Sequence, residues 1–428
     1  MRSRITAVIA AMSALALVLV GCGGVSEDAG SDPNNPNQVE VFTWWASGND
    51  KSSFSTLVDV FKSQNPSIHL IDASVRGSGG EQARAAIAAR LESNNPPDSF
   101  QAAAGAGLTD YIEAGQIQDL TAWYAENDLN TGVYRAALLE LLSVDGKIYS
   151  VPLAIHRVNV VWSNTEVLES AGVDPAVAPT TIDAWIEDLE TLKESGVEYP
   201  LALGNSWAQT QLFENVLVSD LGAVLYQNLW KSTKNWEGDR LQAAVAHYAQ
   251  LLTYVDPSSR SQEWDEATQT VVDGKAGYIV MADFALASFQ KAGYAYGDQY
   301  TSYPMPGTNG IFDFLAESFT LPTGAVHDAS AKAWLLTLTS TEAQKAFSLK
   351  KGSIPARVDV VADDYPPYQQ NAIASLKLDT VVPSLAHGVA ANPAWTKDIT
   401  DAVVKFGSDG HPQALLNALI DLANSNLD

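Results

Sequence analysis

Apolar and polar positions in the N-terminal part of the chain follow two alternating periods. A strand-like alternation over residues 39–45 is followed by apolar positions at helical spacing over 54–61. The succession repeats, with a β-rich segment at 68–75, a helical pattern up to Leu91 and a short strand at 99–102. Strands that alternate with helices predict an α/β lobe with a largely parallel sheet.

A second region carries its own set of elements. Residues 155–162 form an apolar run that predicts a strand, and TTID at 180–183 resembles a capping box ahead of a helix. Helical patterns then dominate to about Val272, and 275–281 is typical of a buried strand. The total length exceeds what one hydrophobic core usually serves, so we expect two lobes, the second opening near Pro152.

Two adjacent tryptophans, Trp44 and Trp45, stand where the first strand should end, just before a polar turn. Ligands of open α/β sheets bind beyond the carboxyl ends of the strands, so the pair is a candidate for ligand contact. The alternative is packing against the sheet. It stays open for one of the two, because consecutive strand residues face opposite sides.

The N-terminus is typical of an exported protein. Residues 1–21 combine Arg2 and Arg4 with an apolar run shorter than the ~20 residues of a membrane span, which predicts a secretory signal. LVGC at 19–22 resembles a bacterial lipobox, so we expect Cys22 to be lipidated and the protein to be anchored outside the cytoplasm. The alternative is an ordinary cleaved signal with an incidental thiol. Residues 22–38, rich in Gly, Ser, Asp, Asn and Pro, predict a flexible tether.

The net charge bears on possible partners, and the cysteine content bears on disulfide bonds. The formal net charge is -25, and removal of residues 1–21, with two arginines and no acids, gives -25 - 2 = -27. Such a chain repels nucleic acid, so we expect no nucleic-acid partner. With one cysteine, the chain cannot form an internal disulfide.

Catalytic signatures are weak. Ser348-x-x-Lys351 fits S-x-x-K, but the partner motifs of penicillin-recognising enzymes are absent. The glycine run at 77–80 fits neither common phosphate-binding pattern, and the six histidines lack zinc-site spacing. We therefore expect no metal or cofactor, whereas counting acids cannot exclude a glycosidase carboxylate pair.

Several motifs together give the chain a family resemblance. It resembles the substrate-binding lipoproteins of bacterial sugar ABC importers, in the group that takes up glucose and related sugars. The motifs that carry the resemblance occur in the family's order: FTWWASGND, NNPPDSFQ, VPLAIHRVNVVW, LALGNSWAQTQLFENV, DGKAGYIVMADF, PGTNGIFDFLAESF, KGSIPAR and SLAHG.

The resemblance implies a two-lobe α/β fold of the periplasmic-binding-protein type, with a hinge and a cleft between the lobes. It implies lobe boundaries that place 39–154 and 317–355 in the N-terminal lobe and 155–316 and 356–428 in the C-terminal lobe. It also implies a sugar ligand, a membrane permease as partner and no chemistry on the ligand. A monomer is the default oligomeric state.

Sugar chemistry gives the candidate residues their roles. An indole face can cover the apolar C–H face of a pyranose, while carboxylates, amides and basic groups bind its hydroxyls. The family's motifs, matched residue by residue, give these candidate ligand-binding positions: Trp44, Trp45, Asp50, Gln101, Trp207, Trp264, Asp283, Phe284, Glu317, Lys351 and His387. The alternative for Asp50 is a helix cap, and Trp207, Asp283, Gln209 and Arg157 could serve to brace the cleft.

Three departures from the family pattern bear on the ligand. Ala103 replaces a histidine or lysine, Phe284 replaces a tryptophan and Glu317 replaces an aspartate. These changes enlarge the pocket or alter which hydroxyls are bound, so a neutral monosaccharide other than glucose, or a disaccharide, is expected.

Two further function classes remain open. One is a secreted glycan hydrolase that uses carboxylates such as Asp50 and Glu317. The other is a receptor for a polyol or a sugar phosphate, which the scarcity of clustered Lys and Arg disfavours.

Overall fold

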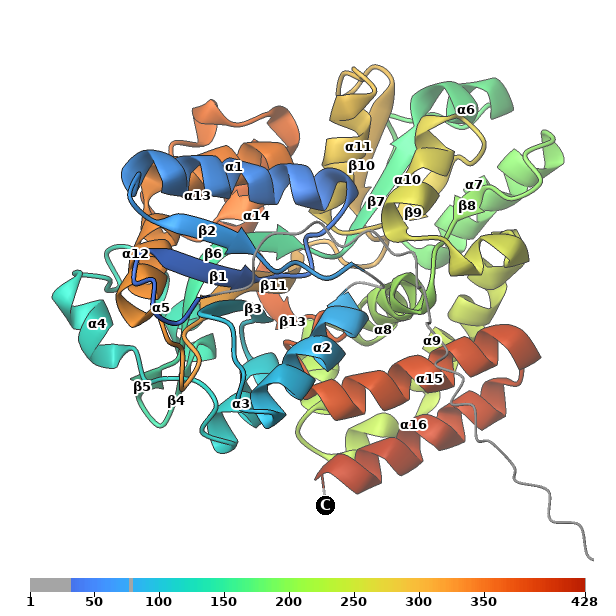
Figure 1. Cartoon of the computed structure of the whole chain (residues 1–428). Coiled ribbons are helices and arrows are strands. Elements are labelled where there is room, and N and C mark those ends of the chain that lie inside the picture. The colour runs from blue at the N-terminus through green and yellow to red at the C-terminus, as the bar shows by residue number, and fades with distance from the viewer. Residues whose placement is uncertain (1–31, 77–79, 428) are drawn as a thin grey trace, which may run out of the picture.

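The larger of two sheets defines what we call the first lobe (Figure 1). The computed structural model describes residues 32–76 and 80–427, and within them seven strands form a sheet of order β12-β6-β11-β3-β1-β2, with β13 paired to β11. The strands of this sheet are β1 (Gln38–Phe42), β2 (His69–Asp72), β3 (Ser99–Ala103), β6 (Ser150–Arg157), β11 (Ile311–Thr320), β12 (Ile354–Pro355) and β13 (Thr380–Pro383).

The prediction of a largely parallel sheet is wrong for this lobe. β1 pairs in parallel with β2 and β3, and β11 with β13, but β11 runs antiparallel to β3 and β6, and β12 antiparallel to β6. The chain leaves the first lobe at the Arg157 end of β6 and re-enters it along β11 at the same end of the sheet, where Phe314 pairs with Arg157. A returning strand must run against its neighbours, and local patterns carry no sign of that return.

A smaller sheet defines the second lobe. Among the described residues it has the order β10-β7-β9-β8. Its strands are β7 (Val160–Asn164), β8 (Leu201–Ala202), β9 (Tyr278–Val280) and β10 (Tyr300–Pro304). A separate hairpin in the first part of the chain pairs β4 (Ser143–Val144) with β5 (Lys147–Ile148).

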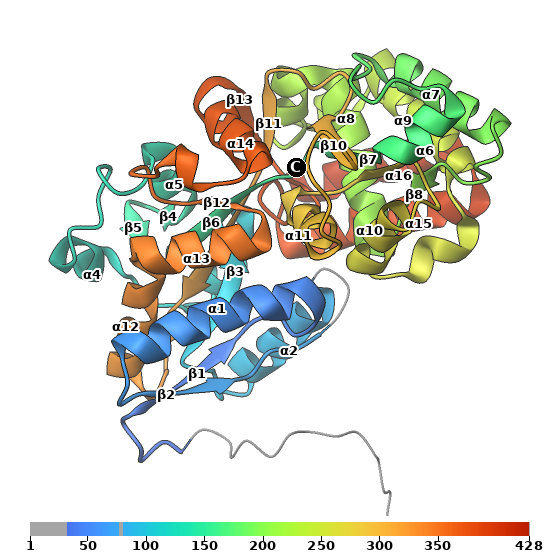
Figure 2. The same ribbon diagram turned by 90° about the horizontal axis from the view of Figure 1, so that it is seen from above.

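Helices cover both sheets, and the two lobes lie beside each other in Figure 2. The helices before β7 and those between β11 and β13 are α1 (Gly48–Gln64), α2 (Glu81–Glu92), α3 (Thr109–Glu113), α4 (Thr121–Glu126), α5 (Ala136–Leu141), α12 (Asp328–Thr339), α13 (Thr341–Lys351) and α14 (Pro367–Leu378). The remaining helices are α6 (Thr165–Ala171), α7 (Ile182–Glu194), α8 (Ser206–Leu229), α9 (Asp239–Leu251), α10 (Trp264–Val272), α11 (Leu286–Lys291), α15 (Pro393–Asp409) and α16 (Pro412–Leu427). No helix in the described ranges has the length and apolar character needed to cross a bilayer.

The segment predicted as one strand over 155–162 is two strands in different sheets. β6 ends at Arg157 in the first lobe and β7 begins at Val160 in the second. Both strands are buried throughout, so the hydrophobic pattern shows no break between them. Asn159 lies at the break, and its side chain donates to Thr308 Oγ1 at 2.8 Å and to the Ile311 carbonyl at 3.0 Å, both in the segment that returns to the first lobe.

Most other predicted elements are confirmed. The strands at 39–45, 68–75, 99–102 and 275–281 correspond to β1, β2, β3 and β9, and the helical pattern at 54–61 lies inside α1. The helix predicted after TTID is α7, whose N-cap Thr181 accepts a hydrogen bond from the Ala184 amide at 3.2 Å. The predicted lobe boundaries remain a prediction, and β11 lies in the first-lobe sheet from Ile311 onward.

The lobes are joined where the chain changes sheet, at 158–159 and again between β10 and β11. Asn159 ties these two crossings together through the bonds described above. Beyond β13, the amides of Leu385 and Ala386 donate to the buried carboxylate of Glu214 on α8, at 2.9 and 2.7 Å. The segment after β1 lies opposite α10 of the second lobe, because a Cβ at Gly48 would lie 2.6 Å from Asp265 Oδ2.

Candidate functional site

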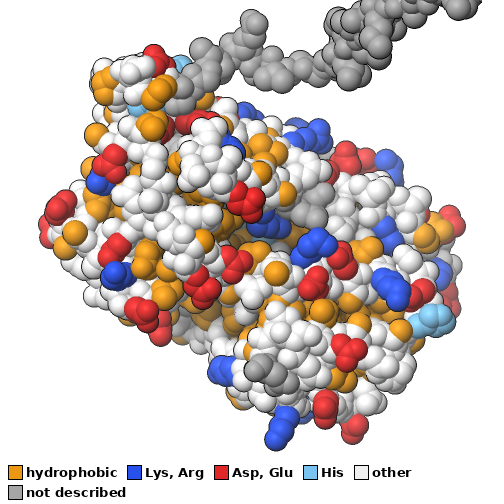
Figure 3. All heavy atoms as spheres, turned by 60° about the horizontal axis from the view of Figure 1, so that its bottom comes forward, with side chains coloured by type: hydrophobic (Ala, Val, Ile, Leu, Met, Phe, Trp, Pro, Cys, Tyr) orange, Lys and Arg blue, Asp and Glu red, His pale blue; other side chains and the backbone are white. Residues whose placement is uncertain are grey.

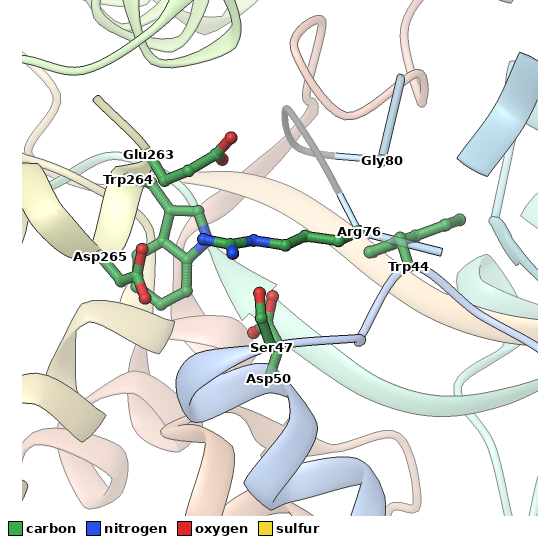
Figure 4. A pocket seen from close by; sticks show the side chains of 8 residues that line it. All are labelled: Trp44, Ser47, Asp50, Arg76, Gly80, Glu263, Trp264 and Asp265. Atoms are coloured by element: carbon green, nitrogen blue, oxygen red, sulfur yellow. The ribbon is translucent and has the colours of Figure 1, made fainter. Parts of the chain in front are cut away.

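A cavity of about 390 Å³, open to solvent, lies between the two lobes (Figure 4). This volume includes open solvent, and the space available to a water-sized sphere is about 40 Å³, below the ~300–1,000 Å³ that is usual for small-molecule sites. The lining residues come from both lobes: Trp44, Ser47, Asp50, Arg76 and Gly80 from the first, and Glu263, Trp264 and Asp265 from the second. On the face shown in Figure 3, acidic and basic side chains are interspersed.

Lys351 connects charged and aromatic groups beside this cavity. It ends α13, its side chain is 4% exposed, and its ammonium forms an ion pair with Asp50. The same nitrogen lies 5.7 Å from the ring centroid of Trp264 and 4.7 Å from that of Phe284. Both distances suit a cation–π contact, so a first-lobe cation is stabilised by second-lobe rings.

An aromatic cluster in the second lobe surrounds Phe284. Its ring centroid lies 4.8 Å from that of Trp264, 6.0 Å from that of Trp207 and 6.3 Å from that of His387. His387 Nδ1 lies 2.7 Å from Ser384 Oγ, and burial lowers the pKa of His387 well below its ordinary value. The imidazole is therefore neutral at neutral pH and can hydrogen-bond without carrying charge.

A buried amide and carboxyl lie under the tryptophan pair. Gln101 Nε2 donates to Glu317 Oε2 at 2.5 Å, and Gln101 Oε1 accepts from the Trp44 amide at 3.3 Å and from the Thr43 hydroxyl. Burial raises the pKa of Glu317, although the charges of His156 and Lys351 oppose that rise. The network fixes the backbone from which Trp44 reaches the cavity.

The two tryptophans have different surroundings. Trp45 is fully buried, and its ring packs 4.8 Å from Phe347 and 5.8 Å from Phe319 in the first-lobe core. Trp44 is half-buried and lines the cavity beside Gly80. A Cβ at Gly80 would lie 3.1 Å from the Trp44 ring, and Gly80 has φ +91°, so this position favours glycine on both counts.

Other predicted site residues form the frame behind the cavity. Asp283 is fully buried and accepts hydrogen bonds from the Arg157 amide, at 3.0 Å, and from His156 Nδ1. Trp207 Nε1 donates to the Ala386 carbonyl at 3.1 Å, while Gln209 Nε2 donates to the carbonyl of Gly204 at 3.4 Å.

The structure brings part of the predicted set to the cavity, whereas Trp45 packs in the first-lobe core. Trp44, Asp50 and Trp264 line the cavity, and Lys351 joins Asp50 to the Phe284 cluster. Several cavity residues escaped the sequence analysis, namely Ser47, Arg76, Gly80, Glu263 and Asp265. Ser47 lies within WWASGND, Gly80 lies in the glycine run and Arg76 directly before it, and Glu263 and Asp265 flank Trp264, so proximity to these segments was the available signal.

Comparison with known proteins identifies the family. Residues 45–345 match the family model described as "Bacterial extracellular solute-binding protein". The chain belongs to this family of solute-binding proteins. As a member it is extracellular and holds a solute without catalysis, so the glycan hydrolase considered from the sequence is excluded.

Individual relatives agree with this assignment. The solute-binding protein is 31% identical to an uncharacterized ABC transporter extracellular-binding protein of Pyrococcus horikoshii, over 96% of this chain and 94% of the relative. It is 30% identical to a xylose/arabinose-binding protein of Haloferax volcanii, over 83% of this chain and 78% of the relative. The bacterial solute receptor AcbH, described as preferring β-D-galactopyranose, matches in structure with a TM-score of 0.79 and 17% identity, over 92% of this chain and 100% of that chain. The two-lobe fold expected from the sequence is confirmed.

Proposed function

We propose that this solute-binding protein is the carbohydrate-binding component of an ABC importer, which binds a neutral mono- or disaccharide between its lobes and delivers it to the membrane permease. The observation that carries the proposal is the pairing of two indoles, Trp44 and Trp264, from opposite lobes around one cavity. The relative described as xylose/arabinose-binding supports a sugar ligand.

The chemistry of the cavity suits a sugar. Covering ~50 Å² of a pyranose C–H face by an indole contributes about 1 kcal/mol. Micromolar affinity needs about -8 kcal/mol, so hydrogen bonds to the hydroxyls must supply most of the remainder. Asp50 lines the cavity and offers an acceptor, and Lys351, whose ammonium lies 5.7 Å from the ring centroid of Trp264, offers a donor.

Closure of the lobes couples binding to transport in this proposal. A ligand that touches Trp44 and Trp264 at once favours the closed state, because both contacts exist together only when the lobes are close. The permease then distinguishes the loaded receptor by its closed shape.

Thermal-shift screening tests the proposal, because a ligand that binds only the folded state raises the melting temperature. We expect at least one neutral sugar among D-glucose, D-galactose, D-xylose, L-arabinose, maltose and cellobiose to raise it, with stoichiometric binding confirmed by calorimetry. Comparison of glucose with maltose and cellobiose separates a monosaccharide site from a disaccharide site. If none of these sugars shifts the transition, the carbohydrate assignment is contradicted.

We also propose a lipid anchor at Cys22, which lies outside the described residues, as do the predicted signal and most of the tether. The lipobox-like LVGC carries this proposal. In a bacterial host, the Cys22→Ser variant is expected to move from the membrane fraction to the soluble extracytoplasmic fraction. Retention of this variant in the membrane fraction would argue against lipidation. The protein is proposed to act as a monomer, which light scattering checks.

A further inference from the structure

Asp265 brings a second-lobe carboxylate into the cavity from the first turn of α10. In Figure 4 it lies beside the ring of Trp264, whereas Asp50 projects from the first-lobe helix α1. It also touches the first lobe, because a Cβ at Gly48 would lie 2.6 Å from Asp265 Oδ2. Asp265 therefore stands where the two lobes meet at the cavity.

Two carboxylates from opposite lobes consequently face one cavity. Burial raises the pKa of Asp265, and the charge of Asp50 raises it further, which places the two groups within electrostatic reach of each other. Lys351 is paired with Asp50, whereas the ion pairs found in the described ranges give Asp265 no cation. One oxygen, Asp265 Oδ1, accepts from the Glu266 amide at 3.1 Å, which leaves Oδ2 directed toward the other lobe.

The other charged side chains of the cavity do not cancel the negative charge of these carboxylates. Glu263 is acidic, and Arg76 is exposed on the first-lobe side, with its guanidinium extended toward Trp264 in Figure 4. The cavity therefore carries the carboxylates of Asp50, Glu263 and Asp265 against the guanidinium of Arg76 and the Lys351 ammonium that is paired with Asp50, which leaves 3 - 2 = 1 net negative charge. An anionic ligand group placed near Asp265 would meet net negative charge.

We propose, building on the carbohydrate-binding function above, that Asp265 is a specificity-determining residue that accepts hydrogen bonds from ligand hydroxyls and selects against negatively charged sugars. A site discriminates strongly when the wrong ligand leaves a buried group unpaired or places like charges together. Uronic acids match neutral sugars in shape but add a carboxylate. They are the ligands against which this cavity discriminates.

The experiment compares neutral and acidic partners of the same sugar. Calorimetry measures the affinities of D-glucose and D-glucuronate, and of D-galactose and D-galacturonate, for the wild type and for Asp265→Asn. The asparagine retains the shape, and the capping box of α10 is formed by Glu263 and Glu266, so the helix start is preserved. Asp59→Asn on the exposed face of α1 is the matched control, because it removes the same charge elsewhere.

We expect the wild type to bind the neutral sugar more tightly, and Asp265→Asn to reduce the ratio of neutral to uronate affinity by at least about tenfold, or about 1.4 kcal/mol. Asp59→Asn should leave the ratio unchanged. If Asp265→Asn weakens both ligands by one common factor, Asp265 only steadies the closed lobes and the inference is overturned. Failure of the wild type to bind any neutral sugar would instead overturn the proposed function on which the inference rests.

Discussion

The ammonium nitrogen of Lys351 lies 4.7 Å from the ring centroid of Phe284, a contact that joins the first lobe to the second. The same ammonium is paired with Asp50, and both side chains are largely buried. Since the lysine belongs to one lobe and the ring to the other, the cation–π contact exists only when the lobes are close. Lys351 thus neutralises Asp50 within the first lobe and also forms a contact that stabilises the closed arrangement of the lobes.

Replacement of Lys351 by methionine should weaken sugar binding sharply. The variant removes the cation, leaves Asp50 without its partner and removes the contact with Phe284. The ion pair with Asp50 lies within the first lobe and exists without ligand, so the affinity change comes from the lost cation–π contact between the lobes, worth about 1–2 kcal/mol, and we expect about a 5- to 30-fold loss of affinity by calorimetry. Lys350→Met, at the exposed neighbouring position, is the control and should bind normally. Equal affinities of the two variants would contradict this role.

The adjacent tryptophans should separate binding from stability. Trp44→Ala removes one cavity wall and should lower affinity roughly fivefold, for about 1 kcal/mol of lost stacking, with little change in melting temperature. Trp45→Ala empties a fully buried site among Phe54, Phe319 and Phe347, and should lower the free energy of unfolding by about 3–5 kcal/mol.

Denaturant unfolding and calorimetry on both variants check the distinction. The outcome that would contradict it is a Trp44→Ala protein that is strongly destabilised yet binds sugar with unchanged affinity. Trp45→Ala then serves as the comparison for what a purely core substitution does.

Local patterns predicted the elements well, because each depends on neighbours in sequence. The 39–45 alternation gave β1, and the helical spacing at 54–61 lies in α1. The direction of β11 and the break at Asn159 depend instead on where the chain returns from the other lobe. The periodicity of the sequence carries no information about that return. The prediction of a mostly parallel sheet therefore missed the antiparallel strands.

Some residues of the candidate site could be predicted from sequence motifs, and others could not. Trp44, Asp50, Trp264 and Lys351 could be matched to motifs, and the structure brings them together around one cavity. Asp265 could not be singled out among many acids, because its position becomes distinctive only when α10 meets Gly48 of the other lobe. Contacts between lobes are set by tertiary closure, which a single sequence does not display.

A pair of buried acids at the lobe connection makes the stability of the fold depend on pH. Glu214 on α8 and Asp313 on β11 are both fully buried. Burial raises the pKa of Glu214, and the hydrogen bonds from the amides of Leu385 and Ala386 oppose that rise. Burial, followed by the charge of Glu214, raises the pKa of Asp313 well above its ordinary value. Asp313 is therefore the member of the pair that keeps its proton in the folded state.

The sign of the resulting pH dependence follows from linkage. The folded pKa of Asp313 lies above its unfolded value, so its contribution to stability is complete below the unfolded pKa and is lost as pH rises toward the folded pKa. Each pKa unit of difference corresponds to about 1.4 kcal/mol. Asp313→Asn retains a donor toward Glu214 and has no proton to lose.

The fall in melting temperature from about pH 5 to about pH 8 should therefore be smaller in the Asp313→Asn variant than in the wild type. Asp59→Asn, exposed on α1, should keep the wild-type slope. Parallel pH profiles for the wild type and Asp313→Asn would show that this carboxyl does not control stability at the lobe connection.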